Sequence, residues 1–315
     1  MVFKRYYIDT EPRGLILDST TEKQHKSAKN LDSRPLSEIA ALLLENQIIA
    51  ASSVNEALPQ IESGARIMAH TLQLGGRLIY AAAGSSALMA LADALELGGT
   101  FGIEPNSIQI LMAGGVPNNA EMPGDTEDDI APLEHDLQDI KPCDTLIAIS
   151  ASGNTPYTLA AAKIANHKGT RVIAITNNPD SAIEAISDCG ICLKTPPEVV
   201  SGSTRMGAAT AQKLALNTLS TLMAFELGHI HDGLMVNLKA DNAKLRMRAN
   251  KMVQYIAQVS QQKAQEALDL SGNNVKIAAL LSSGVASKDT AEQLLQQTKG
   301  HLRQALEQLK SSNHK

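Results

Sequence analysis

A single segment decides the fold class of this chain: Asp144-Thr-Leu-Ile-Ala-Ile-Ser-Ala-Ser-Gly-Asn-Thr-Pro-Tyr157. Residues 145–149 are an apolar, β-branched run, which predicts a strand buried on both faces. A short polar loop follows, and Pro156 stands where the first turn of a helix accepts proline. Residues 159–165 favour a helix and residues 171–176 a second buried strand. The segment is therefore predicted to be one βαβ unit.

The polar loop of this unit, residues 150–155, has the chemistry of an anion site. Amide groups at a helix start and the helix dipole favour negative charge, and the hydroxyls of Ser150, Ser152 and Thr155 add donors. The loop lacks the Lys of a Walker sequence and is not G-x-G-x-x-G, so a phosphate monoester fits better than a nucleoside triphosphate. An ordinary helix-capping turn accounts for the same residues equally well.

Composition narrows the classes of function. The chain has 315 residues, of which 43% are apolar, and a net charge of −5, which argues against a general affinity for polyanions. There is no Trp, and only five Tyr and three Phe, so a base-stacking nucleic-acid surface is not expected. No apolar run has the length of a membrane span, and the first residues do not form a secretory signal. The three cysteines favour a cytoplasmic location.

Further strands are predicted at residues 77–83 and 108–112, and helices alternate with them. This alternation predicts an α/β fold with a doubly wound parallel sheet, in which ligands bind at the carboxyl ends of the strands. Two more polar turns fall after predicted strands. Gly84, Ser85 and Ser86 form one, and residues 198–206 form the other, which leads into a long helix carrying Lys213.

The chain is predicted to have three parts: residues 1–34 as an N-terminal arm that a partner subunit orders, 35–259 as the α/β domain, and 260–315 as a small helical module. Within the domain, Ser37 is expected to cap the first helix and Thr126 to begin another. The module is expected to hold three helices, at residues 261–268, 275–281 and 287–309, while residues 242–259 form a tail of the main domain.

Cys189 and Cys192 have the spacing of a redox or metal pair. They stand without a second pair or suitably spaced histidines, so ordinary packing at the entry to a strand is the preferred interpretation. No metal site is predicted.

The ordered set of polar turns resembles a known family. Gly84-Ser-Ser86, Ser150-Ala-Ser-Gly-Asn-Thr-Pro-Tyr157 and Gly202-Ser-Thr-Arg-Met206 together resemble the sugar isomerase (SIS) domain, and more closely the N-acetylmuramic acid 6-phosphate etherases. The resemblance runs from about residue 20 to the C-terminus. It includes the helical module, which is similar to the small ubiquitin-associated-like (UBA-like) module of that family.

The resemblance implies a carbon–oxygen lyase that needs no metal or redox cofactor. It would cleave the lactyl ether at C3 of N-acetylmuramic acid 6-phosphate by elimination and hydration, as a step of amino sugar metabolism and peptidoglycan recycling. Glu96 matches the proton donor of the family, and Glu127 matches its second catalytic glutamate, interpreted here as the base at C2. The resemblance also implies a homodimer with the site near the subunit interface. The expected substrate-binding residues are Gly84, Ser85, Ser86, Ser150, Ser152, Gly153, Asn154, Thr155, Glu198, Ser203, Thr204 and Lys213.

The chain departs from the family at several positions that usually carry charge. Ala87-Leu88 replaces Gly-Arg in the first loop, Val116 replaces a Glu, Asn154 replaces an Arg and Gly207 replaces a Lys. These losses keep two alternatives open. One is a non-catalytic phosphosugar-binding regulator related to glucokinase regulatory protein, and the other is a different sugar-phosphate lyase or isomerase on the same scaffold.

Overall fold

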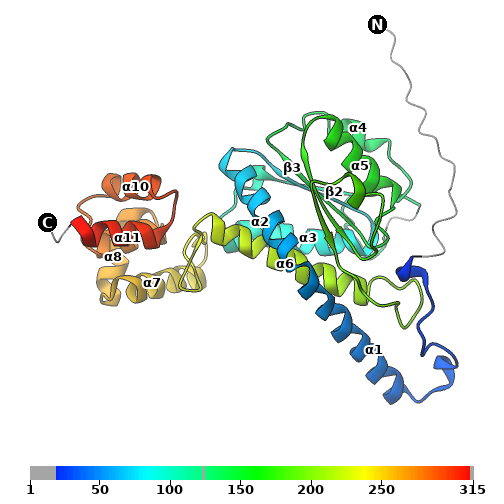
Figure 1. The fold of residues 1–315 in the computed structure, drawn as a ribbon. Coiled ribbons are helices and arrows are strands. Elements are labelled where there is room, and N and C mark those ends of the chain that lie inside the picture. The colour runs from blue at the N-terminus through cyan, green and yellow to red at the C-terminus, as the bar shows by residue number, and fades with distance from the viewer. Residues whose placement is uncertain (1–18, 123–124, 313–315) are drawn as a thin grey trace, which may run out of the picture.

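The computed structural model describes residues 19–122 and 125–312, and its centre is a five-stranded parallel sheet (Figure 1). The strands occur in the order β2-β1-β3-β4-β5, with parallel pairing throughout. The predicted doubly wound parallel fold is thereby confirmed. The strands are β1 (Leu78–Ala82), β2 (Ile108–Met112), β3 (Thr145–Ser150), β4 (Arg171–Thr176) and β5 (Cys189–Cys192).

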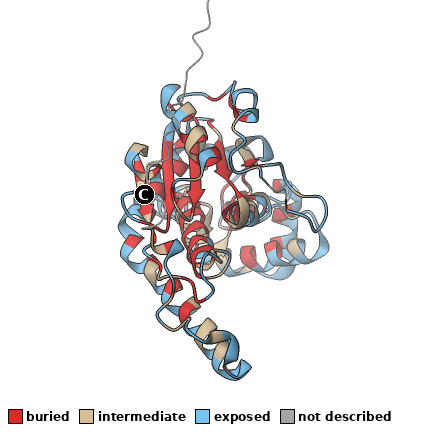
Figure 2. Cartoon of the chain, turned by 90° about the vertical axis from the view of Figure 1, so that its right-hand side faces the viewer, coloured by how far each residue is buried: buried red, intermediate tan, exposed pale blue. Residues whose placement is uncertain are grey.

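Helices cover both faces of the sheet. Successive residues of β3 point to opposite faces, so Ile147 and Ile149 enter one core while Leu146 and Ala148 enter the other. The first core is covered by α2 (Leu58–Gln73), α3 (Gly84–Phe101) and α6 (Gly207–Glu226), and the second by α4 (Pro132–Asp136) and α5 (Pro156–His167). Figure 2 shows the buried sheet between these partly exposed layers.

Helix α1 (Leu36–Ser52) packs on α6 and projects from the body of the molecule (Figure 1). Its N-cap is Pro35, so the prediction that Ser37 caps it is wrong by two residues. The projecting helix leaves large apolar side chains in solvent, since Leu36 is 82% and Leu44 is 63% exposed. A 3-10 turn, Ser53–Ala57, joins α1 to α2.

The sequence prediction also failed at Thr126. Residues 126–129 form a turn closed by the amide of Asp129 and the carbonyl of Thr126 at 3.1 Å. The helix begins only at Pro132, whose fixed φ suits a first helical turn. Acidic residues that resembled a favourable first turn therefore belong to a loop that leads to the carboxyl edge of the sheet.

The C-terminal part is a separate helical layer with its own core (Figure 1). It contains α7 (Ala243–Ala257), α8 (Gln261–Ser271), α9 (Val275–Ser282), α10 (Lys288–Gln297) and α11 (Leu302–Ser312). The predicted single helix at 287–309 is in fact two, because Lys299 and Gly300 both take positive φ angles, of 51° and 82°.

Helix α7 packs with this layer rather than as a tail of the main domain. Its residues Ala249, Met252 and Val253 belong to the third core, together with Val236. The preceding hairpin of β6 (Ile230–His231) and β7 (Leu234–Met235) ends where packing changes from the first core to the third. We therefore propose that the helical module begins near Met235 rather than at residue 260.

A buried lysine joins the helical module to the end of α6. Lys276 is 6% exposed, and its Nζ donates to the carbonyls of Gly228 and Gly300, each at 3.1 Å. A second link is the ion pair of Arg303 with Asp232. The module is thus attached to Gly228 and Asp232, which follow α6. On its own side the contacts involve Lys276, Gly300 and Arg303.

The described part of the N-terminal arm, residues 19–34, lies against its own chain. Thr21 is 3% exposed and bonded to Asn178, and the ordering of the arm by a partner subunit stays a prediction. Residues 1–18 lie outside the described residues. Within the described ranges, no helix has both the length and the apolar character needed to cross a membrane.

Candidate active site

The candidate site lies where the strand order of the sheet reverses, between the carboxyl ends of β1 and β3. These strands pair directly, with Ala82 opposite Ile149. The chain leaves β1 to form α3 on one face and leaves β3 to form α5 on the other. In doubly wound sheets this divergence is where a crevice forms and ligands bind, and the term crevice is used below for this place.

Glu127 is held in this crevice from two sides. The amide of Tyr157, in the first turn of α5, donates to its backbone carbonyl at 2.9 Å. A Cβ built on Gly84 would lie 3.0 Å from Glu127 Oε1, so the carboxylate lies against the first residue of α3. Gly84 has φ +54°, a conformation that glycine adopts without strain. Of the two predicted catalytic glutamates, Glu127 is therefore at the predicted edge.

The predicted loop after β3 is a network of hydroxyls at the start of α5. Ser150 Oγ lies 2.8 Å from Thr155 Oγ1 and 3.3 Å from Ser152 Oγ, and it accepts from the amide of Gly153 at 3.0 Å. Thr155 is the N-cap and Pro156 the first helical residue, as predicted. Several hydroxyls thus meet at a positive helix end, an arrangement that suits an anion.

Asn154, which replaces an arginine of the family pattern, is part of the loop's own structure. Its Oδ1 accepts from the amide of Ala182 at 3.2 Å, and its Nδ2 donates to the carbonyl of Ser152 at 3.2 Å. The side chain therefore fixes the loop to the segment that follows β4. It does not replace the positive charge that an arginine would bring.

The first polar turn, Gly84 to Ser86, is the first turn of α3 rather than a loop before it. Ser85 is half-buried and Ser86 is 7% exposed. Amides in a first helical turn lack partners within the helix, so this turn also presents donors at the crevice.

The third polar turn has a different arrangement from the one predicted. Glu198 is 2% exposed, and its two carboxylate oxygens accept from the amides of Gly207, at 3.0 Å, and Ala208, at 2.9 Å. Glu198 therefore caps α6 and neutralises the positive end of that helix, while its assignment to substrate binding stays a prediction. Ser203 and Thr204 remain half-buried at the outside of the turn.

The structure does not bring Glu96 to Glu127 within one chain. Glu96 is exposed on α3, twelve residues beyond Gly84, which is about 18 Å along a helix axis. Lys213 is likewise exposed, on the second turn of α6. Both side chains are thus directed to solvent rather than into the layer formed by α3 and α6.

A buried polar cluster lies one turn before Glu96. The carboxylate of Asp93 accepts from Tyr80 Oη at 3.1 Å, Asn217 Nδ2 at 2.8 Å and Ser220 Oγ at 2.8 Å. Burial, the largest cause, raises the pKa of Asp93, and the charge of Glu96 adds to the shift. The cluster ties α3 to β1 and α6, and it fixes the rotation of the helix that presents Glu96.

Sequence reasoning missed two asparagines at the carboxyl end of β4. Asn177 is fully buried and links the strand to α6 through Gln212 at 2.9 Å. Asn178 donates to the carbonyl of Ala151 at 2.9 Å and to Thr21 Oγ1 at 3.0 Å. The available signal was a pair of polar residues directly after a buried strand, at the same edge as the hydroxyl loops.

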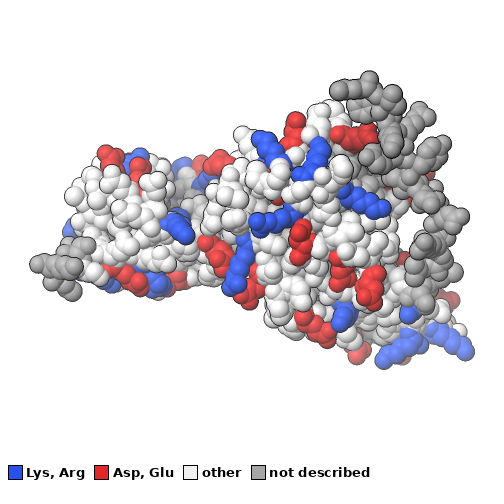
Figure 3. Space-filling view, turned by 45° about the horizontal axis from the view of Figure 1, so that its top comes forward, with Lys and Arg blue, Asp and Glu red and all other residues white. Residues whose placement is uncertain are grey.

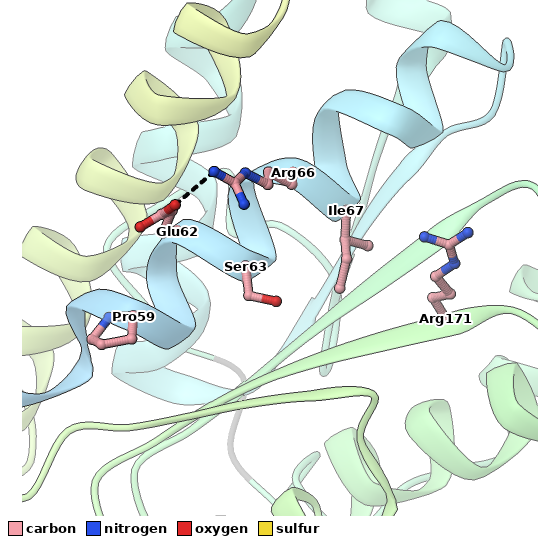
Figure 4. Close-up of a pocket in the computed structure, with 6 residues that line it drawn as sticks. All are labelled: Pro59, Glu62, Ser63, Arg66, Ile67 and Arg171. Atoms are coloured by element: carbon pink, nitrogen blue, oxygen red, sulfur yellow. Dashed lines mark ion pairs between the residues drawn. The ribbon is translucent and has the colours of Figure 1, made fainter.

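A cavity of about 350 Å³ lies elsewhere, between α2 and the beginning of β4 (Figure 4). Arg66 on its wall pairs with Glu62 at 2.7 Å, and Arg171 is the first residue of β4. The cavity is therefore at the amino edge of the sheet, opposite the candidate site.

The paired cysteines pack as predicted. Cys189 and Cys192 are three positions apart on β5, so their side chains point to opposite faces of the sheet. Cys189 Sγ donates to the carbonyl of Gln60 at 3.3 Å, and burial raises the pKa of its thiol.

Comparison with known proteins gives the family of the chain. The SIS domain family matches residues 46–177. N-acetylmuramic acid 6-phosphate etherase of Deinococcus radiodurans is 39% identical over 300 residues, which cover 94% of this chain and 96% of that protein. The Streptomyces avermitilis etherase is 36% identical over 91% of this chain and 93% of its own length. Among solved structures, phosphoheptose isomerase from Neisseria gonorrhoeae is 19% identical, with a TM-score of 0.43 over 60% of this chain and 98% of that one. The chain belongs to the N-acetylmuramic acid 6-phosphate etherase family.

Proposed function

We propose that this protein cleaves the D-lactyl ether of N-acetylmuramic acid 6-phosphate, or of a close relative, to N-acetylglucosamine 6-phosphate and D-lactate. The observation that carries the proposal is the position of Glu127, whose carboxylate lies beside Gly84 where two donor-rich helix starts meet. A carboxylate next to an anion-binding loop suits proton removal from a sugar phosphate. Membership in the etherase family supports the same reaction.

The phosphate is proposed to bind at the start of α5, with the first turn of α3 as the second wall. Neutral donors and two helix ends supply most of the attraction there. The residues proposed to contact substrate are Gly84, Ser85, Ser86, Ser150, Ser152, Gly153 and Thr155, with Ser203, Thr204 and Lys213 further out.

In the proposed reaction the sugar first opens to its aldehyde, which acidifies the proton at C2. The Glu127 carboxylate takes that proton while the Glu96 carboxylic acid protonates the ether oxygen, so that the C3–O bond breaks and lactate leaves. Water then adds across the new C2–C3 double bond. Its hydroxyl goes to C3, Glu96 accepts the remaining water proton, and Glu127 returns a proton to C2, which restores both groups.

The mechanism requires Glu96 and Glu127 at one site, and we propose that a homodimer brings them together across subunits. The outer side of the α1, α3 and α6 layer supports this arrangement. Leu95, next to Glu96, is 69% exposed, and α1 exposes Leu44 and Ile48. A second copy would cover these side chains. We propose that the dimer works in the cytoplasm, where its free cysteines would stay reduced.

The direct test is to incubate the purified protein with N-acetylmuramic acid 6-phosphate and to measure D-lactate. Binding of N-acetylglucosamine 6-phosphate by calorimetry is measured in parallel. Lactate release supports the proposal. Phosphosugar binding without lactate release contradicts it and favours the non-catalytic regulator.

Subunit mixing tests whether the site is shared. Glu96→Gln and Glu127→Gln should each abolish lactate release as separate proteins. After mixing and subunit exchange, a shared site should recover about a quarter of wild-type activity, because half of the dimers are mixed and one of their two sites is intact. No recovery after demonstrated exchange contradicts a site built from both subunits.

A further inference from the structure

The proposed substrate is strongly anionic, yet the three polar turns hold little positive charge. Residues 84–86, 150–155 and 198–206 contain a single basic residue, Arg205. Asn154 is engaged within its own loop. At Gly207 a Cβ would lie 3.0 Å from the Ala50 Cβ and 3.2 Å from Glu198 Oε2, so a lysine there would need its neighbours to move. Apart from Arg205, the three turns therefore offer an anionic substrate no positive charge.

The described part of the N-terminal arm reaches this edge of the sheet. Asn178 bridges the arm to the phosphate loop, because its Nδ2 contacts both Thr21 Oγ1 and the carbonyl of Ala151, while its Oδ1 accepts from the amide of Thr21 at 3.3 Å. On the other side, Ser201 Oγ donates to the carbonyl of Glu22 at 3.3 Å. The backbone at residues 21–22 is thus fastened between the Ser150 loop and the third polar turn.

Lys23 follows directly after this fastened segment, and Lys26 lies three residues further on, within a turn that the amide of Ala28 closes on the carbonyl of His25 at 2.9 Å. Lys23 and Lys26 are exposed, and within residues 19–122 and 125–312 neither has an ion-pair partner. In Figure 3, blue side chains lie at the right-hand end of the molecule, the end at which Figure 1 shows the arm. Since opposite charges attract across several ångströms, unpaired cations at the rim favour an incoming dianion.

The end of the arm, residues 27–34, serves as an internal comparison. Arg34 Nη2 donates to the carbonyl of Ser27 at 2.9 Å and to the carbonyl of Lys29 at 3.0 Å. Lys29 therefore belongs to a local turn with Arg34 rather than to the segment fastened at the loops. Lys29 has the same charge as Lys23 and Lys26 and lies on the same arm, so it serves as the control for loss of a lysine.

We infer that Lys23 and Lys26 are substrate-recognition residues, which supply the anionic groups of the phosphosugar with the positive charge that the three turns lack. The inference rests on the proposed function and deepens it. The two lysines attract the anionic groups of the substrate through their charge, whereas the hydroxyls of residues 150–155 donate directed hydrogen bonds to it. Thr21 is a positioning residue, since it is bonded to Asn178, which in turn contacts the loop at Ala151.

The test compares Lys23→Met/Lys26→Met with Lys29→Met in the full-length protein. Affinity for N-acetylglucosamine 6-phosphate and, in the Glu127→Gln background, for N-acetylmuramic acid 6-phosphate is measured by calorimetry. The double variant should bind at least about tenfold more weakly, and Lys29→Met should bind like wild type. Raising the salt concentration should weaken wild-type binding more than binding by the double variant.

The two ligands separate the two anionic groups. Weaker binding of both identifies the phosphate as the partner of the lysines, and weaker binding of the lactyl sugar alone identifies its carboxylate. Thr21→Val should also weaken binding, and combining it with the double variant should add less than the sum, because both act through one contact. Additive effects would contradict positioning by Thr21.

Failure of this inference is distinguishable from failure of the proposed function. If wild type binds neither phosphosugar, the proposed function is wrong. If wild type binds and the double variant binds equally well with an unchanged salt dependence, the function stands and the role of the arm is overturned. Circular dichroism and thermal unfolding establish that each variant is folded.

Discussion

The amide of Tyr157 donates a hydrogen bond to the backbone carbonyl of Glu127 at 2.9 Å. Tyr157 is 3% exposed in the first turn of α5, so this bond fastens the Glu127 turn to a buried element. Only the backbone of Glu127 takes part, and its side chain stays exposed beside Gly84. Changing the carboxylate therefore leaves the anchor in place, which makes Glu127 a clean position for testing chemistry.

Glu127→Gln is expected to lower the rate of lactate release by about 10²–10⁴-fold, the usual contribution of a positioned base. Affinity for N-acetylglucosamine 6-phosphate should be retained, because the hydroxyl loop is unchanged. Steady-state lactate assays and calorimetry measure the two quantities. Asp128→Asn, which removes an exposed neighbouring acid, is the matched control and should keep activity. Wild-type turnover by Glu127→Gln would rule out this residue as the base.

Gly84→Ala should lower both stability and activity. The φ of +54° strains any residue with a Cβ by about 1–2 kcal/mol, and the new methyl would press on Glu127 Oε1 at 3.0 Å. Gly99→Ala in the same helix is the comparison, since a Cβ there meets nothing within 4 Å and alanine favours helix by about 0.5–1 kcal/mol. Urea unfolding should show opposite signs for the two variants. Equal stability of both would refute the strain argument.

Glu198→Gln should destabilise the protein by about 1–3 kcal/mol, because a buried cap that binds two amides loses its charge. The expected readout is a lower thermal midpoint, with α6 less protected in hydrogen exchange. Glu307→Gln, at an exposed position on α11, controls for loss of a charge and should change little. If both variants unfold alike, the capping role is not supported.

Lys276 predicts a rise of stability with pH. Burial lowers the pKa of Lys276 to about 8 from its ordinary value of 10.5. Between these values the unfolded chain binds more protons than the folded one, so the free energy of unfolding increases as pH rises through that window. The neighbouring His229, whose pKa is lowered to about 4 chiefly by burial, is already neutral there and does not contribute.

Urea unfolding from pH 7.5 to 10 tests this expectation. Relative to Lys276→Met, wild type should gain stability over the window, by at most about 3 kcal/mol. Lys263→Met removes an exposed lysine from α8 and should keep the wild-type slope. A slope in Lys276→Met equal to that of wild type would place the titrating group elsewhere.

The sheet was predictable because each strand is a compact apolar run. Strands β2 and β4 begin and end at the predicted residues, and Pro156 marks the true start of α5. The failures have local causes. At Thr126 the acidic residues have the composition of a first helical turn, but the helix begins at Pro132. At 287–309 apolar spacing continued through Gly300, whose positive φ ends the helix.

The site was only partly predictable, because its contacts join positions far apart in sequence. The hydroxyl loop is local, so its residue types and Pro156 were enough to locate it. The contact of Glu127 with Gly84 and the bridge from Thr21 through Asn178 to Ala151 depend on strand order and arm path. The capping role of Glu198 was not predictable either. Its partners are backbone amides nine and ten positions later, and every residue except proline has such an amide, so the sequence does not single them out.

Helix α6 connects two ends of the protein that otherwise have little in common. Its twenty residues make a rod of about 30 Å, which begins at the Glu198 cap and ends at the carbonyl held by Lys276. The third polar turn and the C-terminal helices are therefore connected by one continuous element, although Glu198 and Lys276 are 78 positions apart in the chain.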